Sequence, residues 1–380
     1  MIDKIKILYT ISNFDTAGSG IPLLKIASNL DQDIFEPQIA CLHDRGDLFQ
    51  EVRESGIKVH FVELYKKARP ITKMLKECYQ LSKIFKNINP HIIHSYDYSS
   101  DYTEPLAAKM AGVKWIYTKK NMSWYGPSYR GWKLRSWLAD GIICQNKDML
   151  QRFFPNWKKT RLISIGVDTN EYRKQPVKNN IRKKWNIPSN ARIIISVANL
   201  VPVKGIEILI NAFEQLCNDY PDWKLMIVGD NTTAYGIELK DKISGLSYLK
   251  DRIIFTGKQK NVREILDLAE IYVQPTLNKG RMEGEGAPIA IQEAMANGKV
   301  VIGSDVPGIR DQLHNFPENL FSPNNYLDLK SKLLKFISND VKVNTEIGKK
   351  FVNFVLINYE LNIEKKQLQN YYIDLINNIN

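Results

Sequence analysis

Short runs of β-branched and other apolar residues alternate with amphipathic stretches along most of this chain, and that alternation constrains its fold most. Such runs predict strands, and the stretches between them predict helices, so the chain reads as βαβ units that build a parallel sheet. We expect strands at Ile5–Ile11, Pro37–Leu42, Lys58–Val62, Ile92–His94, Trp115–Thr118, Gly141–Cys144, Arg161–Ser164, Ile193–Val197, Lys224–Val228, Arg252–Thr256, Ile271–Gln274, Val300–Gly303 and Asn319–Phe321. Helical patterns are clearest at Ile21–Leu30, Ile71–Phe85, Ile206–Cys217 and Val262–Leu268.

The number of expected strands and the length of 380 residues favour two domains over one. A polar stretch over residues 166–190, which contains Pro176 and Pro188, interrupts the alternation and is typical of a linker. We therefore expect an α/β fold of two doubly wound, Rossmann-like domains, residues 1–175 and 176–360. From about Leu327 onward the pattern predicts helices without a strand.

Doubly wound domains bind ligands in loops that follow the carboxyl ends of their strands. The first such loop, Ser12–Gly20, holds Gly18 and Gly20 just before an expected helix. Glycines there allow a ligand to approach the backbone and the helix N-terminus. Position 23 is Leu, so a full dinucleotide-binding G-x-G-x-x-G is absent, and a tight turn explains the glycines equally well.

A second loop, Ser196–Gly205, follows the first expected strand of the second domain. It ends in Lys204 and Gly205, where the chain enters a helix. A lysine at this place can reach the oxygens of a bound phosphate. Taken alone, it is more often a solvated side chain.

The third loop, Arg281–Gly298, is the most informative, because it places two glutamates around a helix start. Glu285 lies in its glycine-rich part, Pro288 in the expected first turn of the helix, and Glu293 one to two turns further on. The carboxylates can accept hydrogen bonds from sugar hydroxyls while loop N–H groups bind a diphosphate. A hydrolase with paired carboxylates is the competing interpretation, but the glycines suit anion binding better.

Several short motifs share their order and spacing with the retaining glycosyltransferases of family 4. They are Lys204-Gly205, Val228-Gly-Asp230, Phe255-Thr-Gly257, the E-x7-E element from Glu285 to Glu293 with its trailing Ala-Met-Ala296, and Pro307-Gly308. In the first half, Pro90-His-Ile-Ile-His94, Ala139-Asp140 and Gly166-Val-Asp168 are similar to family landmarks. The resemblance covers nearly the whole chain and is clearest in its C-terminal half.

This resemblance implies the GT-B architecture, two facing Rossmann-like domains. It assigns acceptor binding to residues 1–175 and nucleotide-sugar binding to 176–360, with a helix at 361–380 packing back on the first domain through Tyr371, Tyr372, Ile373 and Leu375. The implied reaction moves a sugar from a nucleotide diphosphate sugar to an acceptor hydroxyl with retention. A UDP-sugar is favoured over a GDP-sugar, although no motif determines the base. The acceptor is expected to be a glycan or lipid-linked intermediate of a bacterial-type surface polysaccharide, such as lipopolysaccharide or capsule.

The resemblance also implies roles for single residues. Lys204 is expected at the diphosphate, Glu285 at the donor sugar and Glu293 at the ribose, and Lys204, Glu285 and Lys120 are the expected catalytic groups. The donor-binding set is Gly18, Gly20, Asn199, Lys204, Gly229, Glu285, Gly286, Ala287, Pro288 and Glu293. A front-face mechanism, in which a donor phosphate oxygen takes the acceptor proton, needs no enzyme nucleophile. No cofactor and no metal are expected, since the second domain lacks an Asp-x-Asp element.

Two positions depart from the family pattern. Asn199 stands where many members have Arg, and Lys120 stands near the place of a His that follows the fifth strand. Lys120 can supply positive charge in place of that His, but the two changes leave the donor geometry and the activity itself open. Two further classes also stay open: a nucleotide-sugar epimerase on the same scaffold, and a membrane- or nucleic-acid-binding protein without catalysis.

Charge is distributed unevenly, with 28 Lys or Arg against 18 Asp or Glu in residues 1–180 and 25 against 23 in residues 181–380. Residues 109–161 hold twelve basic side chains, two acidic ones and five of the seven Trp. Basic residues among Trp are typical of a surface that meets anionic lipid, so we expect peripheral membrane contact through 109–161. Alternatively, some Trp are core residues and the lysines only keep the surface soluble; without a recognised motif, nucleic acid is not expected as a partner.

The expected location is the cytoplasm, at the inner face of the cell membrane. The longest apolar run, Ile193–Val203, is about half of the roughly 20 residues that span a bilayer, and the N-terminus has the pattern of a strand rather than a signal peptide. Cys41, Cys78, Cys144 and Cys217 are scattered without paired spacing, which predicts buried thiols in a reducing compartment.

Overall fold

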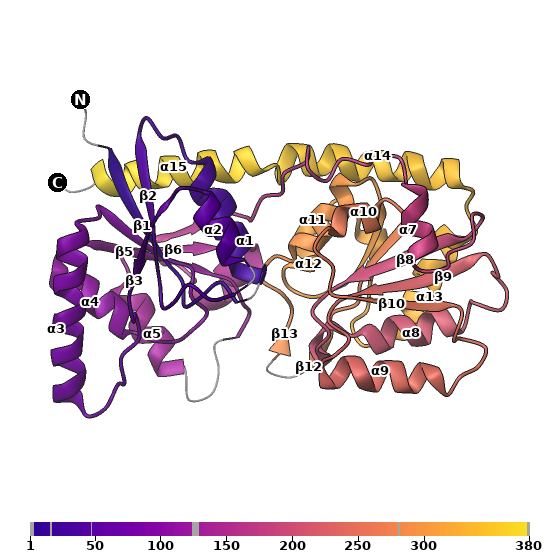
Figure 1. Cartoon of the computed structure of the whole chain (residues 1–380), viewed down its shortest axis with the longest axis horizontal. Helices are drawn as coiled ribbons and strands as arrows, with labels where there is room; N and C mark the ends of the chain where they lie inside the picture. The colour runs from indigo at the N-terminus through magenta and orange to yellow at the C-terminus, as the bar shows by residue number, and fades with distance from the viewer. Residues whose placement is uncertain (1–3, 16, 47, 124–128, 280–281, 378–380) are drawn as a thin grey trace. The chain divides into compact units, whose positions relative to one another are not determined.

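The computed structural model describes residues 4–15, 17–46, 48–123, 129–279 and 282–377. Within them the chain forms two compact units (Figure 1). Unit 1 spans Met1–Ser164 together with Glu364–Asn380, and unit 2 spans Ile165–Ile363. Each unit is a parallel sheet with helices, so the α/β class and the two Rossmann-like units that the alternation predicted are present.

In the described part of unit 1 the sheet has seven parallel strands in the order β3-β2-β1-β4-β5-β6-β7. The strands are β1 (Ile5–Thr10), β2 (Phe35–Cys41), β3 (Lys58–Phe61), β4 (Ile92–Ser95), β5 (Lys114–Lys119), β6 (Gly141–Cys144) and β7 (Thr160–Leu162). Its helices are α1 (Ala17–Asn29), α2 (Phe49–Glu54), α3 (Ile71–Ile88), α4 (Thr103–Ala111), α5 (Tyr129–Leu138), α6 (Lys147–Phe153) and most of α15 (Leu361–Asn377). The strand order reverses between β1 and β4, where doubly wound sheets open a crevice.

In the described part of unit 2 the main sheet has six parallel strands in the order β10-β9-β8-β11-β14-β15. The strands are β8 (Arg192–Val197), β9 (Trp223–Val228), β10 (Ile253–Gly257), β11 (Ile271–Gln274), β14 (Val300–Ser304) and β15 (Leu320–Phe321), with a separate hairpin of β12 (Asn278–Lys279) and β13 (Met282–Glu283). Its helical elements are α7 (Asn179–Lys184), η2 (Pro202–Lys204), α8 (Ile206–Glu214), α9 (Ala234–Ser244), α10 (Val262–Leu266), α11 (Ile289–Ala296), α12 (Ile309–Gln312), η3 (Pro317–Asn319), α13 (Tyr326–Ile337) and α14 (Val341–Asn358). Here the order reverses between β8 and β11.

All the strands that the apolar runs predicted are present, with small shifts of their ends. Central strands of both sheets, such as β4, β6, β11 and β14, are buried on both faces, which is why they read as continuous apolar runs rather than as alternating ones. The edge strands β3 and β7 are partly exposed. The two-residue strands β12 and β13 were not expected, because segments so short carry no periodicity.

The start of α1 differs from the prediction. The helix begins at Ala17 rather than Ile21, so Gly18 and Gly20 lie in the helix and not in a loop. Gly20 is buried, and a Cβ added to it would lie 2.5 Å from Leu48 Cδ2 and 2.9 Å from Phe14 Cδ1. The missing side chain of Gly20 therefore serves the packing of α1 against unit 1.

The polar stretch 166–190, which we expected to be a linker, packs within unit 2. Val167, Ile181 and Ile187 belong to the main hydrophobic core of that unit, and the stretch contains α7. Polar and charged residues together dominate its composition, but its few apolar side chains are enough to attach it to the core. The units divide between Ser164 and Ile165, and again between Ile363 and Glu364.

The C-terminal region is helical, as predicted from Leu327 onward, and its last helix packs in unit 1. Tyr372 of α15 is fully buried, and its hydroxyl lies 3.1 Å from the hydroxyl of Tyr9 and 2.6 Å from Nδ1 of His94. His94 in turn contacts Thr118 Oγ1 at 2.8 Å through Nε2. This chain of hydrogen bonds fastens the end of the chain to β1, β4 and β5.

All four cysteines are free and buried, as their spacing predicted. Within the described ranges, no helix has the length and apolar character needed to cross a membrane.

Candidate functional site

The loops after β8 and β11 meet at the carboxyl end of the unit 2 sheet, beside the point where the strand order reverses. Lys204 ends the short helix η2 that follows β8, and Gly205 after it has a φ of +66°. A Cβ on Gly205 would lie 1.9 Å from the carbonyl oxygen of Pro275, so no other residue fits without moving backbone. Gly205 thus lets the Lys204 loop lie directly against the loop after β11.

Glu285 is the partner of Lys204 in this arrangement. Lys204 Nζ lies 2.6 Å from Glu285 Oε1, and the two side chains retain 21% and 16% of their exposure. The Glu285 loop is held by its own N–H, which donates to the carbonyl of Pro307 at 2.9 Å. Gly308 has a φ of +82°, and a Cβ on it would lie 2.4 Å from the Glu285 carbonyl oxygen. The Pro307-Gly308 motif therefore fixes the backbone of the glutamate loop.

A directional chain of hydrogen bonds leads along β11 to the same carboxylate. Tyr272 donates its hydroxyl hydrogen to Gln274 Oε1 at 2.6 Å, and Gln274 Nε2 donates to Thr276 Oγ1 at 3.2 Å. Thr276 Oγ1 donates to Glu285 Oε1 at 2.8 Å. The Thr276 hydroxyl accepts a hydrogen bond from the Gln274 amide, and its single hydrogen is donated to the Glu285 carboxylate. The relay holds Glu285 as an acceptor.

Glu293 lies on α11 near the same strand end. Burial raises the pKa of the Tyr272 phenol well above its usual value, and the charges of Glu293 and Glu285 raise it further. Burial also raises the pKa of Tyr172, and so do the charge of Glu293 and a hydrogen bond to it. The two glutamates of the E-x7-E element thus both act on Tyr272, whereas Tyr172 is a contact of Glu293 that the sequence pattern did not indicate.

The remaining expected donor residues of unit 2 lie in the loops that follow β8, β9 and β13. A Cβ on Gly229 would lie 2.1 Å from the carbonyl oxygen of Ala198, so Gly229 allows the loops after β9 and β8 to approach closely. Asn199 is exposed, Gly286 is buried and Ala287 is half-buried. Pro288 is the residue before α11 rather than part of its first turn.

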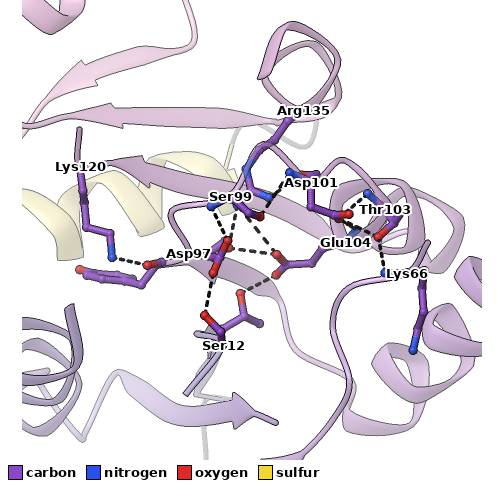
Figure 2. Close-up of polar contacts among 12 residues, drawn as sticks. Ser12, Lys66, Asp97, Ser99, Asp101, Thr103, Glu104, Lys120 and Arg135 are labelled. Carbon is purple, nitrogen blue, oxygen red and sulfur yellow. Dashed lines mark hydrogen bonds and ion pairs between the residues drawn. The ribbon is translucent and has the colours of Figure 1, made fainter. Parts of the chain in front are cut away.

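Lys120 lies in unit 1, directly after β5. Its ammonium donates to the carbonyl oxygen of Tyr96 and lies 4.8 Å and 4.5 Å from the ring centroids of Tyr96 and Tyr98 (Figure 2). Burial lowers the pKa of Lys120 to about 7, although the charge of Asp97 acts in the opposite direction. The Lys120 amine thus contacts two aromatic rings and the carbonyl oxygen of Tyr96, and burial favours its neutral form.

A buried polar network lies beside Lys120 at the carboxyl ends of β1 and β4 (Figure 2). Glu104 accepts hydrogen bonds from Thr10 and Ser95, and Arg135 lies 3.9 Å from it; both charged side chains are fully buried. Arg135 donates to the Asp101 carbonyl at 2.6 Å and stacks on Trp115 at 4.7 Å.

Asp97 extends this network toward the β1 end. Ser12 donates its hydroxyl to Asp97 at 2.9 Å, and the Ser99 N–H donates at 2.6 Å. Burial tends to raise the pKa of Asp97, but the hydrogen bonds from Ser99 and Tyr65, together with the charge of Arg135, make the net shift downward. Burial raises the pKa of Glu104, and the charge of Arg135 counters part of that shift. Sequence reasoning did not identify Asp97, Glu104 or Arg135 as a unit; the placement of Asp97 after β4 was the available signal.

The basic, Trp-rich window 109–161 is mixed in character. Trp115 and Trp132 are buried in the unit 1 core and Trp157 is half-buried, whereas Trp137 is 70% exposed. Trp124 lies outside the described residues. The core interpretation therefore holds for Trp115 and Trp132, and Arg135 of this window is a buried residue rather than a surface one.

Among the described residues, no group of three or more His, Cys, Asp or Glu side chains is placed to hold a metal ion.

Two family models match consecutive parts of the chain. The model described as Glycosyltransferase Family 4 matches residues 18–171, and the model described as Glycosyl transferases group 1 matches residues 177–351. Together they span both units.

Two similar curated proteins extend over nearly the full length. One is the UDP-Gal:alpha-D-GlcNAc-diphosphoundecaprenol alpha-1,3-galactosyltransferase of Escherichia coli, which is 23% identical over 92% of this chain and 92% of its own. The other is the N,N'-diacetylbacillosaminyl-diphospho-undecaprenol alpha-1,3-N-acetylgalactosaminyltransferase of Campylobacter jejuni, 22% identical over 94% of this chain and 96% of its own.

Solved structures share the fold. A glycosyltransferase from Rickettsia africae superimposes with a TM-score of 0.83 at 20% identity, covering 99% of this chain and 100% of that one. HepE of Anabaena, solved in complex with UDP and glucose, superimposes with a TM-score of 0.80 at 18% identity, covering 97% and 99%.

Proposed function

Because this chain belongs to glycosyltransferase family 4 and has the GT-B fold, we propose that it transfers a sugar, with retention, from a UDP-sugar to an acceptor hydroxyl. The observation that carries the proposal is the Lys204–Glu285 pair at the carboxyl end of β11. The pair is partly exposed, lies at the switch point of a doubly wound sheet, and is held by loops that only glycine permits at two positions.

Lys204 is the proposed contact of the donor diphosphate. Negative charge develops on the leaving nucleotide diphosphate while the anomeric carbon becomes cationic, so a fixed ammonium stabilises the transition state more than the ground state. The N-terminus of α11 and the N–H groups of Gly286 and Ala287 add partial positive charge at the same loop. In the free protein, Glu285 balances the charge of Lys204.

Glu285 is the proposed ligand of the donor sugar, and Glu293 that of the ribose. Glu285 accepts from Lys204 and Thr276 through Oε1, and a carboxylate is an acceptor of the kind that sugar hydroxyls donate to. We assign Thr276 as the residue that positions Glu285, supported by Gln274 behind it. Gly229 and Asn199 belong to the loops around this donor site, and Gly18 and Gly20 are the corresponding proposals in unit 1.

The nature of donor and acceptor is inferred from relatives. The Escherichia coli relative is named for UDP-galactose and a diphosphoundecaprenol acceptor, and HepE is seen with UDP. We therefore favour UDP over GDP, and a lipid-linked intermediate of a surface polysaccharide as acceptor. An acceptor of this kind would place the reaction at the inner face of the cell membrane, in the cytoplasm, and the reduced buried cysteines are compatible with that location.

Retention is proposed to follow a front-face course without an enzyme nucleophile or a metal ion. In such a course a phosphate oxygen of the donor takes the acceptor proton as the C–O bond to the diphosphate breaks and the bond to the acceptor oxygen forms. The protein then needs to supply positive charge and position, which Lys204 and Lys120 provide. Exclusion of water protects the activated donor from hydrolysis.

The test combines binding with turnover. Thermal shift with UDP and GDP identifies the base, and incubation with a panel of UDP-sugars and undecaprenyl-diphosphate-linked acceptors, with and without EDTA, identifies the reaction. We expect stabilisation by UDP, transfer that EDTA leaves intact, and a product whose anomeric configuration by NMR matches the donor. Inversion, a requirement for metal, or epimerisation of the donor in the absence of acceptor would each contradict the proposal.

A further inference from the structure

Helix α3 exposes a line of apolar side chains that the described residues of unit 1 leave uncovered. Ile71, Leu75 and Tyr79 follow one another at intervals of four residues and are 59%, 42% and 54% exposed. Residues four apart lie on one stripe of a helix, so the three form a continuous ridge. The core-facing side of α3 is a separate stripe that includes Met74, Cys78, Leu81 and Phe85.

Positive charge surrounds this ridge. Lys83, one further turn along, lies 4.7 Å from the ring centroid of Tyr79, and Lys76 and Lys86 are exposed nearby. The exposed basic residues of α3 and the segment before it are Lys67, Arg69, Lys73, Lys76, Lys83 and Lys86. Glu77 is the one acidic residue of α3, all of which is described, and it lies 3.8 Å from Lys73.

The same character continues over α4 and α5, which lie on the same side of the unit 1 sheet as α3 (Figure 1). Met110 of α4 is 37% exposed, and Trp137 of α5 is 70% exposed. Lys109, Arg130, Lys133 and Leu134 are exposed as well. Both helices are described throughout, and Glu104 is their single acidic residue. Because Glu104 is buried, it places no negative charge on this surface.

We propose that this outer surface of α3, α4 and α5, the α3–α5 face, docks onto an anionic phospholipid bilayer. Aliphatic and aromatic side chains enter the boundary between headgroups and acyl chains, while Lys and Arg beside them meet lipid phosphates. The inference goes beyond the transfer reaction, and it moves the lipid contact from the window 109–161 as a whole to a face that is centred on α3.

The chemistry of the face distinguishes lipid from other occupants. A second copy of the chain would bring the same positive charge against it, which opposes association. Nucleic acid could contact the lysines through its phosphates. Its phosphate backbone offers no apolar contact for Ile71 and Leu75. A bilayer satisfies the apolar ridge and the charges together.

Lys159 and Arg161, the basic residues at the far end of the window, are engaged elsewhere. Lys159 donates to the carbonyl oxygens of Trp137 and Ala139 at 2.9 Å and 2.6 Å, and Arg161 lies 5.5 Å from the ring centroid of Tyr371. Lys159 and the buried Trp115 and Trp132 therefore contribute to the packing of unit 1, whereas Arg161 is exposed beside Tyr371.

The test is sedimentation of the full chain with vesicles of phosphatidylcholine, with or without phosphatidylglycerol. We expect binding that requires phosphatidylglycerol and is lost when salt rises from about 0.1 M to about 1 M, because the Debye length falls from about 10 Å to about 3 Å. The triple variant Lys76→Gln, Lys83→Gln, Lys86→Gln should partition at least about tenfold more weakly, since each basic residue near the surface contributes about 1 kcal/mol. Leu75→Ser with Tyr79→Ser should weaken binding as well.

A matched control removes the same charge from unit 2, with Lys240→Gln, Lys342→Gln and Lys350→Gln at exposed positions. Its binding should equal that of the unchanged protein. Equal losses in the two triple variants, or equal binding to vesicles with and without phosphatidylglycerol, would overturn the proposal. So would a concentration-dependent dimer, seen by analytical ultracentrifugation, that Leu75→Ser with Tyr79→Ser abolishes.

The experiment is independent of turnover. UDP-induced thermal stabilisation verifies that each variant is folded, and transfer to a water-soluble acceptor analogue should be unchanged in the α3 variants. Vesicle binding without any transfer would contradict the proposed function and leave the α3–α5 face standing. Transfer without selective vesicle binding would contradict the α3–α5 face and leave the proposed transfer reaction unaffected.

Discussion

Both units collect charged side chains where their strand order reverses, but they treat the charges in opposite ways. In unit 1, Glu104 and Arg135 are fully buried among hydroxyls, carbonyls and an indole ring. In unit 2, Lys204 and Glu285 form a 2.6 Å ion pair that stays partly open to solvent. A buried pair must be satisfied within the protein, whereas an open pair can exchange its partner for a ligand. The comparison separates charges that maintain the fold from charges that are available for chemistry.

Glycines at the open pair and in the unit 1 core also differ in what an added Cβ would strike. Gly205 and Gly308 of unit 2 allow loops to approach each other at the open pair, with backbone carbonyls as the atoms that a Cβ would strike. Gly20 of unit 1 leaves room for the side chains of Phe14 and Leu48 inside the core. At these positions, Gly205 and Gly308 bring backbone segments together at a candidate site, whereas Gly20 makes room for side chains that pack against a helix.

The largest expected effect breaks the open pair. Lys204→Ala or Glu285→Ala should each lower kcat/KM of sugar transfer by about 10³-fold, because each removes a group proposed to act on the donor in the transition state. The free energy of unfolding should change by less than about 1 kcal/mol, since partly exposed pairs contribute little. Steady-state transfer assays and urea unfolding measure the two quantities; turnover near normal in either variant would remove the pair from the active site.

Next comes the buried pair. Arg135→Met leaves the Glu104 carboxylate buried without its countercharge and should cost about 3 kcal/mol of unfolding free energy. Arg130→Met, at an exposed position of the same helix, is the matched control and should stay within about 0.5 kcal/mol. Urea unfolding followed by tryptophan fluorescence gives both values, and similar stability of the two variants would end the distinction between the units.

A smaller effect tests the hydrogen bonds that lead from Tyr272 through Gln274 and Thr276 to Glu285. Thr276→Val keeps the shape of the side chain but removes the hydroxyl that donates to Glu285, so kcat should fall at least about tenfold, because a hydrogen bond to a charged group contributes about 1.5–3 kcal/mol. Thr276→Ser retains the hydroxyl and should restore most of the rate. Loss of activity in Thr276→Ser as severe as in Thr276→Val would assign Thr276 to packing instead.

The smallest expected effect concerns pH. The pKa of Lys120 is lowered to about 7, so its charged form is present below that pH and is lost as pH rises through it. If the charge of Lys120 assists transfer, kcat should fall about fivefold between pH 7 and pH 8. Lys120→Arg keeps its charge and should flatten the profile. Burial lowers the pKa of the neighbouring Lys119 to about 7 as well, so a profile unchanged in Lys120→Arg would assign the titration to another group.

Much of the fold could be predicted because strand and helix signals are local. Ile271–Gln274 and Gly141–Cys144 have the predicted bounds, since a buried parallel strand reads as a continuous apolar run. The start of α1 was missed because Gly18 and Gly20 are poor helix formers, and the packing of Gly20 against Phe14 and Leu48 is a contact that favours the helix there. Local propensity cannot include that contact.

The candidate site was predicted in its members but not in its connections. Lys204 and Glu285 are 81 residues apart in the chain, and their ion pair depends on Gly205 and Gly308 bringing loops together. Thr276 and Tyr172 carried no motif, so their contacts with the two glutamates became visible only in the folded chain.

The sequence by itself determined the class of fold, two parallel-sheet units, and the identity of the glutamates and the lysine at the second sheet's edge. Both depend on periodicity and spacing, which the chain carries before it folds. The tertiary structure decided which charges and aromatic rings face water. Arg135, Trp115 and Trp132 share a window with Trp137 and Lys133, yet the first three are buried and the last two are exposed. Burial is set by contacts between distant segments, and composition within a window does not record them.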